Sequence, residues 1–346
     1  MTSFNEVCID VTKTAKKIPQ SDYLVSGKYK IFDQGKDYIG GYTNDKTGIV
    51  EDYPYIVFGD HTRIIKFVDE PCFIGADGVK LLKVYNSQFL PKYVYYSLVA
   101  NPIVSLGYSR HFKYLKEQSI RDCSINEQER IITELETNEK AISIKKESLY
   151  SLDELVKSRF IEMFGNPISE QKWIIKKWND VLEIKNGKDY KKNLSDIENG
   201  YPVYGSGGFM NIYADTYLCE GIITIIGRKG NISNPLLVEG KIWNVDTAFG
   251  IIVKTDILNP IFFHHCSKFY DYEKMNKATT IPSLTKSDLL NLEIILPPIE
   301  LQNKFAEFVK LIDKSKFVCH SKNFLCDILT FSSSTMAYPS VVSIFV

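Results

Sequence analysis

The stretch NEQERIITELETNEKAISIKKESLYSLDELVKSRFIEMFGNP, residues 126–167, decides how the chain is organised. Asn126 is a favourable N-cap, and Glu129 completes a capping-box pattern at the start of a helix. The Gly-Asn-Pro sequence that closes the stretch is typical of a helix terminus. A helix over 127–163 is therefore predicted, about 55 Å long at about 1.5 Å per residue.

Apolar side chains along this helix form a stripe with seven-residue spacing, which Ile131, Leu152 and Phe160 widen. The predicted helix-packing and subunit-packing residues are Leu135, Ile142, Leu149, Leu152, Val156, Phe160 and Met163. Heptad spacing favours packing against another long helix over the role of an ordinary core helix. A second helix is predicted to begin near Pro298, because proline suits a first helical turn. We expect the two helices to pair antiparallel and to act as a spacer.

Two β-rich regions flank the first helix, and their sequences resemble each other. The run YIVFGDHTR at 55–63 resembles ITIIGRKGN at 223–231, and INEQ at 125–128 resembles IELQ at 299–302. Three further pairs are FDQG with YGSG, GADGVKLLKV with NVDTAFGIIV, and FLPKYVYYSL with LNPIFFHHCS. All five pairs occur in the same order at an offset of about 170 residues, which indicates an internal duplication.

Each repeat has the same plan of short β-rich runs broken by Gly, Asn and Asp turns, followed by helical segments. Helical stretches are expected near 91–100 and 260–270. The predicted fold class is α+β, with two homologous α/β domains that are β-rich. Long antiparallel coiled-coil-like helices are expected to separate them in a pseudo-two-fold arrangement.

The composition is that of a folded protein, since 44% of the 346 residues are hydrophobic and 24% are charged. No run of about 18 apolar residues is present, so no helix is expected to cross a membrane. The N-terminus lacks the basic-then-apolar pattern of a signal peptide, and a cytoplasmic protein is expected. The 42 basic and 42 acidic residues balance, so any contact with nucleic acid needs local basic patches.

Disulfide and metal chemistry are not expected from the cysteines. The chain has seven of them, an odd number, with wide spacings and no CxxC pair. His264 and His265 stand next to Cys266, but this group alone does not have the spacing of a zinc site. The predicted metal content is therefore none.

The order of β-rich domain, long heptad helix ending SLDELVKSRFIEMFGNP, and the same again resembles the specificity subunits of type I restriction–modification enzymes. The stretches 151–167 and 279–302 are the most specific parts, and the resemblance covers about residues 1–320. It implies a non-catalytic subunit in which each domain, called a target-recognition domain, reads one half of a bipartite double-stranded DNA site. It also implies that the long helices bind two methyltransferase subunits.

The same resemblance implies which cofactors lie outside this chain. None is expected to bind here: S-adenosylmethionine would serve the methyltransferase partner in adenine methylation, and ATP and Mg would serve a restriction and motor partner. The implied domains are 1–124 for target recognition, 125–166 for the central helix, 167–297 for target recognition, 298–320 for an incomplete second helix, and 321–346 for an aberrant tail. No charged residue occurs from 328 to 346, so a frameshifted or recombined end is expected there.

Candidate DNA contacts are polar and basic residues in the loops, because such side chains suit base edges and phosphates. They are Lys36, Asp60, His61, Thr62, Arg63, Arg110, His111 and Lys113 in the first domain, and Ser206, Gly208, Arg228, Lys229, Asn231, Lys277, Thr279 and Thr280 in the second. The turns 61–63 and 228–229 are favoured most, because they occupy equivalent positions in the two repeats.

Three alternatives remain. An enzyme would need a cofactor or nucleotide motif, yet the glycine run 205–208 lacks a strand–GxGxxG–helix context and no Walker lysine loop is present. A coiled-coil interaction scaffold explains the helix and the neutral charge, but not two diverged β-rich domains. An inactive or reserve specificity allele would explain the unusual C-terminal sequence.

Overall fold

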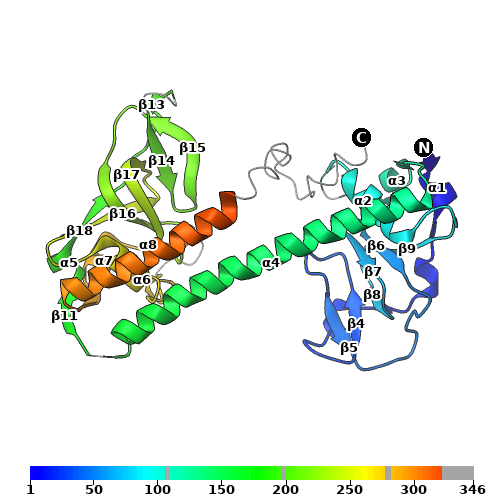
Figure 1. Cartoon of the computed structure of the whole chain (residues 1–346), viewed down its shortest axis with the longest axis horizontal. Helices are drawn as coiled ribbons and strands as arrows, with labels where there is room; N and C mark the ends of the chain where they lie inside the picture. Colours follow the sequence, from blue (N-terminus) through cyan, green and yellow to red (C-terminus); the bar gives the residue numbers. More distant parts are fainter. Residues whose placement is uncertain (106, 108, 171, 197–199, 277–281, 322–346) are drawn as a thin grey trace. The chain divides into compact units, whose positions relative to one another are not determined.

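The computed structural model describes residues 1–321 except 106, 108, 171, 197–199 and 277–281. The chain divides into two compact units, which contain Met1–Lys145 and Lys146–Cys319 and are called unit 1 and unit 2 below. Both combine β-sheet with packed helices, so the predicted α+β fold class is confirmed (Figure 1). No helix among the described residues is long and apolar enough to span a membrane.

Unit 1 is built on two four-stranded sheets (Figure 1). The first is antiparallel, with the order β2 (Cys8–Asp10), β9 (Val79–Val84), β6 (Tyr55–Gly59) and β7 (Ile65–Val68). The second has the order β3 (Lys17–Ile18), β8 (Phe73–Gly75), β4 (Tyr29–Phe32) and β5 (Gly41–Thr43). The short strands β1 (Thr2–Ser3) and β10 (Ser119–Ile120) form a separate antiparallel pair.

The helices of unit 1 are α1 (Phe4–Val7), α2 (Pro91–Ala100), α3 (Phe112–Leu115) and the start of α4 (Ile125–Phe164), with the 3-10 turns η1 (Thr12–Thr14) and η2 (Gln20–Asp22). The predicted helix at 91–100 is thus confirmed. Its buried Tyr93 and Val94 pack with Phe58 of β6 and with Leu135 of α4 in one core. The alternating side chains of β6 face a second core on the other side of the sheet, which includes Val57.

Unit 2 contains one seven-stranded sheet, of order β12-β18-β16-β17-β14-β15-β13 (Figure 1). The strands are β12 (Leu182–Asn186), β13 (Leu194–Ser195), β14 (Tyr201–Gly205), β15 (Gly208–Ala214), β16 (Cys219–Gly227), β17 (Leu236–Asn244) and β18 (Ala248–Val253). A separate pair is formed by β11 (Ile174–Lys177) and β19 (Glu293–Leu296). The helices are α5 (Trp178–Val181), α6 (Pro260–Ser267), α7 (Lys286–Leu290), the end of α4 and α8 (Ile299–Ser321), with the 3-10 turn η4 (Glu273–Met275).

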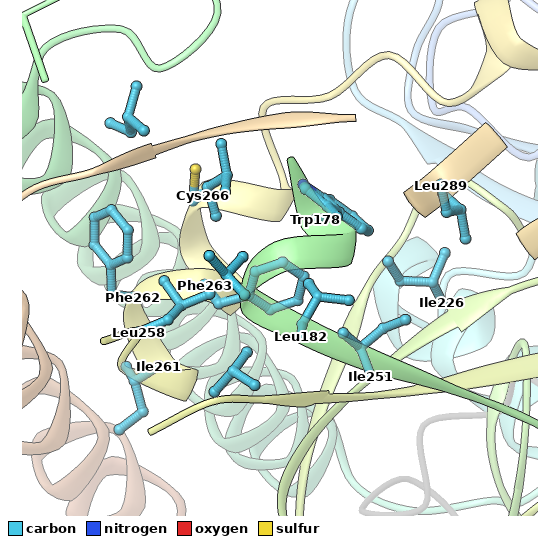
Figure 2. Close-up of a cluster of buried hydrophobic side chains, with 14 of the residues drawn as sticks. Trp178, Leu182, Ile226, Ile251, Leu258, Ile261, Phe262, Phe263, Cys266 and Leu289 are labelled. Atoms are coloured by element: carbon cyan, nitrogen blue, oxygen red, sulfur yellow. The ribbon is translucent and has the colours of Figure 1, made fainter. Parts of the chain in front are cut away.

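The main core of unit 2 combines aliphatic side chains with a group of aromatic ones, among them Trp178, Phe262 and Phe263 (Figure 2). Trp178 of α5 is fully buried and meets the ring of Phe263 of α6 edge-on, with centroids 5.0 Å apart. Phe160 of α4 stacks on Phe262 of α6 at 5.4 Å and meets Phe305 of α8 edge-on at 5.3 Å. Such ring pairs add stabilisation to that of area burial, so α4, α6 and α8 form one packed group.

The duplication predicted from the sequence also appears in matched hydrogen bonds. Gln128 is fully buried: its Oε1 accepts from Leu90 N at 2.8 Å, and its Nε2 donates to the carbonyls of Gln88 and Cys123. Gln302 does the same in unit 2. Its Oε1 accepts from Asn259 N at 2.8 Å, and its Nε2 donates to the carbonyls of Ile257 and Pro297. Each glutamine joins the start of a long helix to the start of α2 or α6.

The predicted antiparallel pairing of long helices is observed in unit 2, between the end of α4 and α8. Asp153 binds Lys316 at 2.6 Å, whereas Phe160, further along α4, contacts Phe305, further back along α8. The guanidinium of Arg159 lies over the ring of Phe308 at 5.9 Å. The two helices therefore run in opposite directions where they pack.

Candidate nucleic-acid interface

Several loops of unit 2 meet on the side of its sheet where strands β12 and β16 end and β18 begins. Asn186 at the end of β12 pairs with Phe249, and Gly227 at the end of β16 pairs with Ala248, so these strand ends lie together. Arg228 N donates to Thr247 O at 2.8 Å, and Leu284 N donates to Arg228 O at 2.9 Å. We call the loops 187–193, 205–208, 228–231, 245–247 and 282–284 the loop edge of unit 2.

Unit 1 has the same arrangement. Asp60 N donates to Gly78 O at 2.6 Å, and His111 N donates to Asp60 O at 2.9 Å, in the way that Arg228 is held in unit 2. Gln34 Oε1 accepts from His61 N at 3.3 Å, which brings the loop after β4 to the turn after β6. The loop edge of unit 1 thus consists of 33–40, 60–63, 76–78 and the described residues of 101–111.

A glycine ends the central strand in each unit for a steric reason. The turn that follows folds back over the strand end, so that a Cβ atom at Gly227 would lie 1.9 Å from Asn231 O. A Cβ atom at Gly59 would lie 2.2 Å from Thr62 Oγ1. Only glycine has room for this close approach, and it therefore presents the polar turn at the loop edge.

The candidate contacts of unit 2 lie together. Arg228, Lys229 and Asn231 are exposed, and Ser206 and Gly208 belong to the tight turn between β14 and β15. The Arg228 guanidinium lies 5.9 Å from the centroid of the Phe249 ring. Lys277, Thr279 and Thr280 lie outside the described residues.

In unit 1 the candidate contacts divide into exposed and buried groups. Lys36, Thr62, Arg110 and Lys113 are exposed, and His61 and Arg63 are half-buried. Arg63 has a positive φ of 65° and its Nη1 donates to Ile103 O at 3.0 Å, so this side chain also ties the turn to the 101–111 loop.

Asp60 and His111 are the buried members, with exposures of 5% and 0%. Asp60 Oδ1 accepts from Phe112 N at 2.8 Å, and the His111 ring Nδ1 lies 3.0 Å from Asp60 O. These bonds connect the turn after β6 to the start of α3. The two side chains therefore support the loop edge and are not on its surface.

The heptad residues of α4 differ in burial. Leu135 is buried in the core of unit 1, and Val156 and Phe160 are buried in the core of unit 2. Ile142, Leu149, Leu152 and Met163 are half-buried. The stripe therefore contributes to both units. Exposed apolar side chains also occur on the long helices, notably Leu155 (47% exposed) and Leu311 (61% exposed).

One basic loop was missed by the sequence analysis. The loop 187–193 carries three exposed lysines, Lys188, Lys191 and Lys192, at the loop edge of unit 2. Its backbone is held by Lys188 N donating to Asn244 O at 3.0 Å and by Trp243 Nε1 donating to Lys188 O at 2.9 Å. The sequence KDYKKN contains the signal, a lysine cluster directly after a strand.

The titratable side chains of the described residues include several buried thiols and no metal-binding cluster. No group of three or more His, Cys, Asp or Glu side chains is placed to hold a metal ion in the described part of the chain. Burial raises the pKa of Cys8, Cys72 and Cys266 to about 12. These thiols are protonated at neutral pH and are poor nucleophiles.

The comparisons with known proteins fit this geometry. Residues 170–322 match the family of the type I restriction modification DNA specificity domain. The fold is similar to the crystal structure of the S subunit of a type I restriction–modification system from M. genitalium, with a TM-score of 0.64 and 15% identity over 100% of this chain and 99% of that one. A structure from work on complex assembly and conformational transition of the type I R-M system has a TM-score of 0.51 and 13% identity, covering 99% of this chain and 96% of that one. No curated protein matches the chain.

Residues 170–322, which are less than half of the chain, thus match the type I restriction modification DNA specificity domain. The resemblance to type I specificity subunits predicted from the sequence is confirmed by this match and by the similar fold.

Proposed function

We propose that the chain is the specificity subunit of a type I restriction–modification complex and reads a bipartite DNA site, with one half-site for each unit. The observation that supports this most is the repeated loop edge. Matched backbone bonds hold Asp60 in unit 1 and Arg228 in unit 2, while the side chains around them differ. The same framework with different side chains suits two readers of different sequences.

Within each loop edge, exposed and buried residues take different roles. In unit 2, Arg228, Lys229 and Asn231 offer donors for base edges, and the lysines of loop 187–193 suit phosphate contacts. In unit 1, Lys36, Thr62 and Arg110 are the exposed candidates, whereas Asp60 and His111 fix the loops. The balanced net charge requires such local basic patches.

The partners proposed are two methyltransferase subunits and the restriction and motor subunits, in a cytoplasmic assembly. A hollow of about 510 Å³ between α4 and α8 is lined by Leu155, Ser158, Arg159, Glu162 and Phe308. Together with exposed Leu155 and Leu311, this groove is a suitable docking site for a methyltransferase helix. The helix α4 would set the gap between the half-sites. S-adenosylmethionine would be used by the methyltransferase, and ATP and Mg by the motor subunit, with no cofactor on this chain.

Co-expression with a methyltransferase subunit, followed by mapping of methylated adenines across a genome, tests the proposal. A single split motif with two constant half-sites is the expected result. A soluble complex that methylates no adenine would favour an inactive or reserve allele. The absence of any complex would favour an unrelated interaction scaffold.

A further inference from the structure

A buried ion pair lies at the base of the loop 33–40 in unit 1. Lys66 of β7 is only 4% exposed, and its Nζ lies 3.3 Å from Asp33 Oδ1 and donates to Asp37 O at 2.6 Å. Asp33 Oδ1 also accepts from Gly35 N at 2.9 Å. One ammonium group therefore holds two points of the loop, four residues apart along the chain.

Strand β7 and neighbouring residues hold this loop in additional ways. Tyr38 Oη donates to Phe67 O at 2.6 Å, and the Tyr38 ring meets Phe32 edge-on at 5.2 Å. At the far end of the loop, Gly40 packs so closely on Asp33 that a Cβ atom there would lie 2.5 Å from its carboxylate carbon. The loop is thus a packed structure around Asp33.

Keeping a lysine in this place is costly, because burial disfavours the charged form. Burial lowers the pKa of Lys66, and the neighbouring Asp33 carboxylate opposes that effect. Buried ion pairs add little net stability compared with apolar side chains of the same size. The pair therefore needs an explanation other than stability of the core.

Unit 2 has a short turn where unit 1 has the loop 33–40, and other residues stand there in place of the Lys66–Asp33 ion pair. Lys66 pairs with Val57 in the sheet of unit 1, and Leu236 pairs with Ile225 at the equivalent place in unit 2. Asp33 follows β4 directly, whereas Gly205 ends β14 and pairs with Gly208 across a tight turn. The lysine and the aspartate are thus both absent where the loop 33–40 is absent.

We propose that Lys66, together with Asp33, is a positioning residue for DNA recognition by unit 1. It holds the loop 33–40 so that exposed Lys36 is presented to DNA and Gln34 keeps its bond to His61 in the neighbouring turn. Lys66 itself is buried and does not touch DNA. This inference rests on the proposed function, and it assigns the pair to one half-site only.

The test compares Lys66→Met with Lys30→Met in the complex with methyltransferase subunits. Lys30 forms an ion pair with Glu70 at 2.7 Å in the same unit, but its side chain is 36% exposed and its partner is outside the loop 33–40. Binding is measured to duplexes that carry single base-pair changes in each half-site. For Lys66→Met, discrimination at the half-site of unit 1 should fall by about tenfold, the effect of one lost base contact, with discrimination at the other half-site unchanged.

A purely structural role would give a different result. It would lower the folded, binding-competent fraction and leave the discrimination ratio of the remaining molecules unchanged, and that outcome would overturn the proposal. If Lys66→Met does not fold because Asp33 is left unpaired, the double variant Lys66→Met with Asp33→Asn removes the buried charge as well. The double variant should fold and show the same one-sided loss.

Hydrogen exchange of the free chain separates this inference from the proposed function. Lys66→Met should increase exchange of amides in 33–40 and leave β16 unchanged, whatever the chain binds. If the unmodified complex shows no discrimination at either half-site, the proposed function fails. If it discriminates but Lys66→Met neither loosens the loop nor alters the ratio, only the positioning role fails.

Discussion

The two units differ in how they hold their loop edges. Unit 1 uses polar side chains, since Asp60, His111 and Lys66 are all buried and bind loop backbone. Unit 2 has a tight turn from Gly205 to Gly208 in place of the loop 33–40, and the described residues of its loop edge carry more exposed lysines. The sheet and helix framework is shared, so the loops can diverge independently of the fold.

The shared framework predicts the largest effects. Gln128→Leu and Gln302→Leu should each destabilise their own unit by about 2–3 kcal/mol, because three backbone groups, most of them part-buried, lose their partners. Chemical denaturation followed by hydrogen exchange locates the loss in unit 1 or unit 2. Gln88→Leu, at an exposed neighbour whose backbone carbonyl is the acceptor, is the control and should have little effect. A small loss of stability in one unit and a large loss in the other would contradict the claim that Gln128 and Gln302 play equivalent roles.

The strand-ending glycines should differ between the units. A Cβ atom at Gly227 meets a backbone carbonyl, which cannot move aside, whereas at Gly59 the nearest atom belongs to the Thr62 side chain. Gly227→Ala is expected to cost about 2–3 kcal/mol and Gly59→Ala about 1–2 kcal/mol, the range for overpacked sites. Thermal unfolding of both variants measures this difference. Equal losses would show that the two turns are held in the same way.

The charge of the two loop edges should appear in the salt dependence of binding. Replacement of Lys188, Lys191 and Lys192 by serine should reduce the slope of log affinity against log salt by about 0.9 for each lost phosphate contact. Discrimination between sequences should remain. The control replaces Lys172, Lys176 and Lys177, which are also exposed. They precede the start of β12, whereas the loop 187–193 follows its end. An equal slope change in the control would place the phosphate contacts elsewhere.

Acid sensitivity should be stronger in unit 2. Burial lowers the pKa of His264 to about 2 and of His265 to about 3, and unit 1 has Tyr95 and Tyr96 at the equivalent positions of α2. The folded pKa values are below those of the unfolded chain, so this stability is complete above about pH 6.5 and is lost as the pH falls. Near pH 5.5, each of the two histidines should lower the free energy of unfolding by about 1 kcal/mol.

Hydrogen exchange at pH 7.5 and 5.5 tests this effect in the whole chain. Opening of α6 should increase at the lower pH, and the double variant His264→Tyr with His265→Tyr should reduce the increase. Unchanged exchange of α6 between the two pH values would contradict the burial of neutral histidines.

Local sequence patterns predicted the regular elements well. The heptad stripe and its caps predicted a helix over 127–163, and α4 extends from Ile125 to Phe164. The turns that follow YIVFG and ITIIG occupy equivalent positions in the two units. Each turn is made by a strand-ending glycine and the polar residues next to it, so a local pattern was enough to predict it.

The supporting side chains could not be predicted in this way. Asp60 and His111 were predicted as DNA contacts, a role that stays untested, but both are buried by partners about 50 residues away. Lys66 reaches Asp33 across 33 residues, and no local pattern indicates that a lysine in a strand will be buried. Polar side chains in such networks depend on long-range contacts, which a one-dimensional pattern does not contain.

The most direct test of the account exchanges unit 1 for that of another specificity subunit. A chimera with residues 1–124 replaced, expressed with a methyltransferase subunit, is analysed by mapping methylated adenines. The account predicts that one half of the bipartite motif changes and that the other half stays the same. A change in both halves, or in neither, would contradict the claim that each unit reads its own half-site.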